Sequence, residues 1–193
     1  MGVSLRKGES VSLEKASGDD ALSVVRMGLG WDTIKKRGLF GGMKEQSVDL
    51  DASCLLFDGQ GALVDQVWFR QLRSRDGAVT HTGDNLTGAG DGDDESIVVD
   101  LGGLAPAVQS LVFVVNSFTG QNFTQIENAF CRLVNQKNEQ EMARYDLSGS
   151  GSHNSQVMAK LSRGAGGWTM TAIGAAATGR TFTDLLPVIS QNL

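Results

Sequence analysis

Apolar and polar residues alternate with a period of two along most of this chain, which is the pattern of strands that bury one face. The alternation recurs in about ten short segments that turn residues separate, a spacing typical of all-β domains. The segments are residues 11–14, 22–29, 48–57, 62–70, 78–82, 95–101, 111–115, 130–134, 142–147, 156–161 and 168–173. We therefore predict an all-β fold, an antiparallel β-sandwich of two sheets.

Helical patterns are rare. The best candidate covers residues 183–192, where Thr183 would cap the helix and Leu185, Leu186 and Ile189 would form its apolar face. Pro187 should keep this helix short. A single further turn is expected over residues 124–129. The 193 residues, of which 40% are hydrophobic, fit a single domain spanning residues 1–193.

Acidic residues and glycines crowd together between residues 84 and 95, and no lysine or arginine offsets them. Two like charges about 5 Å apart repel by roughly 3 kcal/mol at an effective dielectric constant near 20. A folded loop can hold several such pairs only if a cation lies among them, so the segment predicts a divalent metal site. The candidate ligands in this segment are Asp84, Asn85, Asp91, Asp93, Asp94 and Glu95.

The spacing within this segment suggests its geometry. Asp91, Asp93 and Glu95 are separated by two residues, so an extended backbone would point all three to one side. Gly90 and Gly92 would let the backbone bend toward the ion. The segment is not an EF-hand loop, because it lacks oxygen ligands at the third and fifth positions.

Further carboxylates lie elsewhere in the sequence. Asp49 and Asp51 flank Leu50 in a predicted strand, so they should share its outer face. Asp32 ends a strand beside glycines. Oxygen-only ligands favour Ca²⁺, and their number would serve two ions. Zinc or copper would require clustered histidine or cysteine ligands, but His81 and His153 lie far apart. A solvated acidic loop without metal remains the alternative.

The segment Lys35–Lys44 has the opposite character, since it is basic and carries Leu39 and Phe40. It could contact an anionic membrane surface peripherally, or its apolar residues could fold back onto the sandwich. The net charge of −5 argues against nucleic-acid binding. Cys54 and Cys131 lie in apolar stretches and are expected to be reduced structural thiols in a cytoplasmic protein.

The motif from Gly83 to Glu95 resembles the TerD family, the calcium-binding tellurite-resistance and stress proteins of bacteria. Further matching segments are Gly28–Asp32, Asp49–Ser53 and Asn128–Asn135. Members of the family usually carry glutamate where this chain has Ala89. The segment around Lys35–Lys44 is most similar to the TerZ branch.

The resemblance implies a β-sandwich of two antiparallel sheets that binds two calcium ions and has no established enzymatic activity, so we do not expect an enzyme. It implies a role in resistance to tellurite and other stresses, with other Ter-family proteins, including a membrane-embedded member, as partners. A cytoplasmic location, peripheral at the inner membrane face, would suit those partners. Two alternatives of a different class are a calcium-dependent phospholipid-binding module and a glycan-binding module, for which Trp31 is the one plausibly placed aromatic platform. A hydrolase is disfavoured because the chain lacks a Gly-x-Ser-x-Gly nucleophile elbow.

Overall fold

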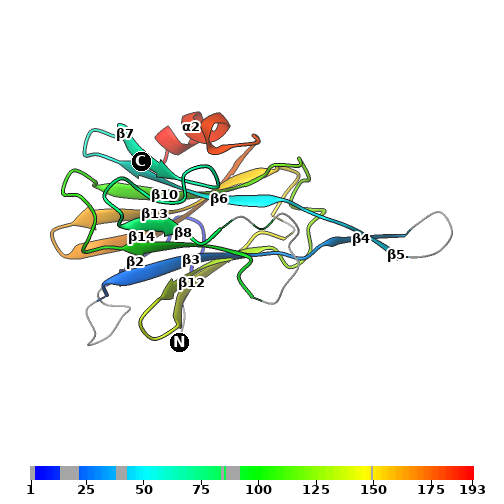
Figure 1. The fold of residues 1–193 in the computed structure, drawn as a ribbon, viewed down its shortest axis with the longest axis horizontal. Coiled ribbons are helices and arrows are strands. Elements are labelled where there is room, and N and C mark those ends of the chain that lie inside the picture. Colours follow the sequence, from blue (N-terminus) through cyan, green and yellow to red (C-terminus); the bar gives the residue numbers. More distant parts are fainter. Residues whose placement is uncertain (1–2, 14–21, 38–42, 84, 86–91, 149) are drawn as a thin grey trace.

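The predicted alternation produces two six-stranded sheets that pack face to face (Figure 1). The structure is a computed structural model and describes residues 3–13, 22–37, 43–83, 85, 92–148 and 150–193. The first sheet has the order β1 (Val3–Ser4), β12 (Gln140–Asp146), β11 (Phe130–Asn135), β3 (Val24–Gly30), β9 (Glu95–Asp100), β8 (Val79–His81). The second has the order β2 (Ser10–Ser12), β14 (Gly167–Ala177), β13 (Ser155–Gly164), β10 (Ser110–Ser117), β6 (Leu50–Phe57), β7 (Leu63–Val67).

All neighbouring strands in the two sheets are antiparallel except β1 and β12, which pair in parallel. The predicted antiparallel sandwich is therefore confirmed. Alternate residues of both sheets fill the space between them, and Met27 and Leu29 of β3 belong to the same core cluster as Cys54 and Leu56 of β6. The residues between them in sequence point outward.

Helix α2 (Phe182–Ser190) covers the outer face of the second sheet (Figure 1). Phe182, Leu185 and Ile189 are buried there against Leu55 and Val114 of that sheet. The helix begins earlier than predicted: its N-cap is Thr181, and Asp184 accepts the backbone N–H of Thr181 at 3.2 Å. Thr183, the predicted cap, therefore lies inside the helix. The turn predicted over residues 124–129 is not helical.

The segment predicted as a basic loop contains a hairpin. Strand β4 (Ile34–Arg37) pairs with β5 (Met43–Gln46), and the hairpin extends from one end of the sandwich (Figure 1). Leu39 and Phe40 lie outside the described residues. Within the described residues, no helix is both long and apolar enough to cross a bilayer.

Two connections close the open sides of the sandwich. The amino-terminal segment passes from β1 in the first sheet to β2 in the second, and residues 68–78 join β7 to β8 across the other side. Cys54 and Cys131 are free and buried, one in each sheet, as expected for thiols that pack in the core.

Candidate metal centre

Asp94 lies where the end of β3 meets the beginning of β9. Its Oδ2 accepts the backbone N–H of Trp31 at 2.9 Å, and its Oδ1 accepts the Asn85 side-chain amide at 2.9 Å. Its own N–H donates to the Leu29 carbonyl at 2.8 Å. Burial raises the pKa of the Asp94 carboxyl, and the charges of Asp32 and Asp93 raise it further despite these hydrogen bonds. Negative charge is thus crowded at this point.

Asp32 is held beside this point by Glu127 and Asn128, which lie in the segment where the sequence predicted a helical turn but no contact with Asp32. Its N–H donates to the Glu127 carbonyl at 3.0 Å, and Asn128 donates its side-chain amide to the Asp32 Oδ2 at 2.6 Å. Asn128 has a φ of 52°, in the left-handed region that asparagine tolerates better than most residues. An asparagine just before β11 was the available signal for this conformation.

Glu95 points into the sandwich and is only 1% exposed. Its Oε2 accepts the Ala52 N–H at 2.9 Å, and its Oε1 accepts the Asn85 N–H at 3.1 Å. His81 places its Nε2 3.4 Å from the Glu95 Oε2, while its Nδ1 accepts the Gly83 N–H. Both oxygens of Glu95 are therefore engaged, and the side chain links β9 of the first sheet to β6 of the second.

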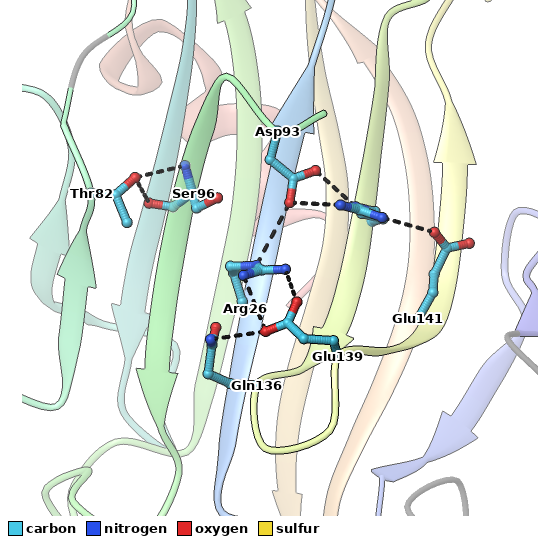
Figure 2. Close-up of polar contacts among 8 residues, drawn as sticks. Arg26, Thr82, Asp93, Ser96, Gln136, Glu139 and Glu141 are labelled. Atoms are coloured by element: carbon cyan, nitrogen blue, oxygen red, sulfur yellow. Dashed lines mark hydrogen bonds and ion pairs between the residues drawn. The ribbon is translucent and has the colours of Figure 1, made fainter. Parts of the chain in front are cut away.

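Asp93 lies on the other face of the first sheet, which corrects the expectation that Asp93 and Glu95 point to one side. Arg132 donates from Nε to the Asp93 Oδ1 at 2.8 Å, and the Arg26 Nε lies 3.6 Å from the Asp93 Oδ2. Figure 2 shows Arg26 between Asp93 and Glu139, and Arg132 lies in the same way between Asp93 and Glu141, with its Nη1 3.6 Å from the Glu141 Oε2. Positive φ at Gly92, +95°, bends the chain just before the strand, so the period of two does not extend back to Asp93.

Two glycines of β3 make room for this bend. A Cβ on Gly28 would lie 2.3 Å from the Asp93 carboxyl carbon, and one on Gly30 would lie 2.4 Å from the Gly92 carbonyl oxygen. Both distances are far below van der Waals contact. Segment 92–93 can therefore lie over β3 only because these two positions lack side chains.

The pair Asp49 and Asp51 lies beside β10. As predicted, Leu50 and Ala52 belong to the core between the sheets, so Asp51 is on the outer face of the second sheet. It is nevertheless only 4% exposed, and Asn116 of β10 directs its amide toward it at 3.5 Å. Asp49 is tied to the turn after β10, because its carbonyl accepts the Phe118 N–H at 3.0 Å.

Trp31 belongs to the core. It is buried, and its indole N–H donates to the Val48 carbonyl at 2.9 Å, directly before Asp49. Trp31 thus connects the two acidic regions and cannot serve as an exposed platform for a sugar ring.

Of the predicted ligands, the structure brings together Asp32, Asn85 and Asp94. It directs Asp93 to arginines and Glu95 to backbone amides, and Asp49 and Asp51 lie with the residues of β10 and the turn that follows it. Asp84 and Asp91 lie outside the described residues. Within the described part of the chain, no three acidic, histidine or cysteine side chains are close enough to hold a metal ion by themselves.

Comparison with known proteins decides the family. The family model described as the TerD domain matches residues 1–186. This chain belongs to the TerD family. It is 52% identical to tellurium resistance protein TerZ of Serratia marcescens, over 95% of this chain and 94% of that protein. This similarity agrees with the resemblance to the TerZ branch.

Other members of the TerD family match over similar lengths. The chain is 41% identical to tellurium resistance protein TerD of Serratia marcescens, covering 90% of each chain, and 39% identical to general stress protein 16U of Bacillus subtilis, covering 93% of each. A solved structure of a TerD homologue from Streptomyces coelicolor superposes with a TM-score of 0.70 at 19% identity, covering 82% of this chain and 92% of that one. That likeness supports the sandwich fold.

Proposed function

We propose that this protein is a calcium-binding, non-enzymatic stress protein that contributes to tellurite resistance. In this proposal it acts as a calcium-dependent scaffold or sensor within a membrane-associated complex of Ter-family proteins. Membership of a family whose relatives are named for tellurium resistance and stress response supports the resistance role.

The observation that carries the calcium proposal is the crowding at Asp94. Its carboxyl has a raised pKa because it is partly buried and faces the charges of Asp32 and Asp93. The arginines of the network in Figure 2 neutralise Asp93, but neither of them contacts Asp32 or Asp94 among the contacts that the structure describes. A bound cation would relieve the repulsion that remains between Asp32 and Asp94.

The donor set fits Ca²⁺. Asp32 and Asp94 would supply carboxylate oxygens, and Asn85 would supply its amide oxygen if the amide turned over. Because calcium takes 6–8 oxygens, the remaining ligands would come from Asp84 and Asp91, from backbone carbonyls and from water. Asp93 and Glu95 would position the loop, because their oxygens already have partners.

A second calcium ion would bind at Asp49 and Asp51. Bound calcium supplies positive charge and fixes the geometry of the loop.

The partners proposed are other Ter-family proteins, one of them embedded in the membrane, with this chain on the cytoplasmic side. The β4–β5 hairpin supports a contact of this kind, because it extends from the sandwich and carries the basic segment Lys35–Lys44.

Calorimetric titration with Ca²⁺ tests the proposal. We expect uptake of two ions by the wild-type protein, in line with two acidic regions. Asp94→Asn, Asp32→Asn and Asp91→Asn should each weaken binding at the loop by at least tenfold, a loss of about 1.4 kcal/mol. At a calcium concentration of about a hundred times the dissociation constant, binding should also stabilise the fold by about 2.7 kcal/mol.

Matched control variants distinguish the loss of a calcium ligand from the loss of a negative charge elsewhere on the protein. Asp146→Asn removes an exposed carboxylate on β12 and should leave the titration unchanged. Asp93→Asn should weaken binding less than Asp94→Asn if Asp93 only positions the loop. Absence of calcium uptake, with equal melting temperatures in calcium and in chelator, would refute the proposal.

A further inference from the structure

Four aromatic rings from three distant segments form a continuous cluster on the surface. Trp68 and Phe69 follow β7, Phe118 follows β10, and Phe182 begins α2. The ring centroids of Trp68 and Phe69 are 4.7 Å apart, those of Trp68 and Phe182 5.1 Å, and those of Phe69 and Phe118 6.0 Å. The fold has thus gathered these rings at the end of the sandwich where β7 and β10 both finish.

Part of this cluster faces solvent. Phe182 is buried beneath the others, Trp68 and Phe69 are half-buried, and Phe118 is 39% exposed. A hydrophobic core alone would not require an exposed phenylalanine at the tip of a turn. Exposed large apolar side chains that adjoin one another mark contact surfaces more often than isolated ones do.

Arginine adds positive charge to the rings. The Arg70 guanidinium lies 5.5 Å from the Trp68 ring centroid and 5.3 Å from that of Phe69. Arg70 is exposed, as is Arg180, two residues before Phe182, and neither side chain forms an ion pair among the contacts that the structure describes. The Asp184 Oδ2 accepts the Arg180 backbone N–H at 2.8 Å, so negative charge lies beside Arg180, and Arg70 is the positive charge of this surface that would meet an anionic partner.

The geometry of the rings selects among anionic partners. Interplanar angles of 66°, 89° and 74° show that each pair packs edge to face, and Arg70 lies over two of the rings. Single-stranded nucleic acid requires free ring faces on which bases stack. A bilayer interface instead accepts aromatic rings at the level of the headgroups, where arginine can reach phosphate.

The cluster adjoins the proposed calcium region and the hairpin. Phe118 donates its N–H to the carbonyl of Asp49, and Asp49 follows the end of β5 by three residues. The cluster therefore lies at the end of the sandwich from which the β4–β5 hairpin extends.

We propose that Trp68, Phe69, Arg70 and Phe118, together called the aromatic–arginine surface, dock this protein on an anionic phospholipid bilayer. The rings would enter the headgroup region and Arg70 would pair with lipid phosphates. This proposal rests on the membrane-associated part of the proposed function but does not require that calcium be bound.

Vesicle sedimentation in calcium and in chelator, with the full-length protein, tests this surface. We expect binding to vesicles of phosphatidylglycerol and phosphatidylethanolamine, and much weaker binding to phosphatidylcholine. Arg70→Gln should weaken binding about fivefold, the contribution of one basic residue near an anionic surface. Arg70→Lys should retain binding because it keeps the charge. Phe118→Ser should weaken binding, whereas Leu63→Ser, at a residue that is 38% exposed at the other end of β7, should not.

Tryptophan emission provides a second measurement. Trp31 and Trp168 are buried, so Trp68 should account for quenching by brominated phosphatidylglycerol, and Trp68→Phe should abolish that quenching. Melting temperatures of all variants check that they fold.

The proposal is wrong if wild-type protein does not sediment with anionic vesicles in either condition. It is also wrong if only Lys35→Gln and Lys36→Gln reduce binding, which would assign the contact to the hairpin, or if a polyglutamate peptide or single-stranded RNA binds and vesicles do not. Calcium titration reports separately on the proposed metal site, so failure of one proposal does not imply failure of the other.

Discussion

Three consecutive acidic residues have different environments in this protein. Asp93 pairs with arginines on the outer face of the first sheet, Asp94 lies in the crowded acidic region, and Glu95 is buried between the sheets. The three residues therefore differ in role although they are adjacent in sequence, because the chain bends at Gly92. Asp93 forms ion pairs, Asp94 is a candidate metal ligand, and Glu95 links the two sheets.

The raised pKa of Asp94 predicts a stability difference that depends on pH. Below the ordinary aspartate pKa the side chain is neutral in both the folded and unfolded states, so it does not change stability. As pH rises through the raised pKa of the folded state, the crowded carboxylate becomes charged and stability is lost. In chelator at pH 7, Asp94→Asn should therefore melt at a higher temperature than the wild type. The gap should narrow as pH falls toward the ordinary aspartate pKa.

Melting curves in excess calcium give the control. The order of the two melting temperatures should then reverse, because only the wild type keeps the carboxylate. If Asp94→Asn instead lowers the melting temperature in chelator, the hydrogen bonds to Trp31 and Asn85 outweigh the repulsion.

The acidic region could be predicted from the sequence, but the different partners of its individual carboxylates could not. Asn85 is hydrogen-bonded to Asp94, and the charge of Asp32 acts on Asp94, but their role as metal ligands stays a prediction. The arginine partners of Asp93 could not be predicted, because Arg26 and Arg132 are far from it in sequence and meet it only through the pairing of β3 with β9 and β11. The burial of Glu95 follows its strand period, yet its bond to Ala52 depends on how the two sheets face each other.

At the scale of elements, periodicity predicted all the strands of the two sheets except β1, and it missed the β4–β5 hairpin. Every predicted alternating segment corresponds to a strand of the two sheets. Strand β1 has two residues, which are too few to show a period. The β4–β5 hairpin was not predicted because its consecutive charged residues interrupt the alternation of apolar and polar residues. The start of α2 was misplaced because both Thr181 and Thr183 are suitable caps, and only the bonds from the Arg180 and Thr181 N–H groups to Asp184 settle the choice.

Helix α2 should depend on one leucine for its attachment. Leu185 is fully buried against the outer face of the second sheet, whereas Leu186 is only partly buried there. Leu185→Ala should destabilise the fold by about 2–5 kcal/mol, the usual range for removing a buried leucine side chain. Leu186→Ala should cost clearly less. Urea unfolding followed by circular dichroism measures both, and equal losses would contradict the packing described for α2.

At the scale of the whole molecule, the two cysteines report on opening of the core. Cys54 and Cys131 are buried, and burial raises the pKa of both thiols well above the usual cysteine range. Because the thiolate is the reactive form, a disulfide reagent at pH 8 should modify neither thiol in the folded protein and both after unfolding in guanidinium. Rapid modification of the native protein would show that the sandwich opens far more readily than its packing indicates.

The strands at the margins of both sheets are short: β1, β2, β7 and β8 have two, three, five and three residues. The amino-terminal crossing and segment 68–78 lie beside these edge strands, so neither sheet has a long edge of unpaired backbone N–H and C=O groups among the described residues. Long exposed edges of this kind can pair with strands of other chains, which leads β-proteins to aggregate. The short edge strands should therefore keep the purified protein from forming fibrils at high concentration.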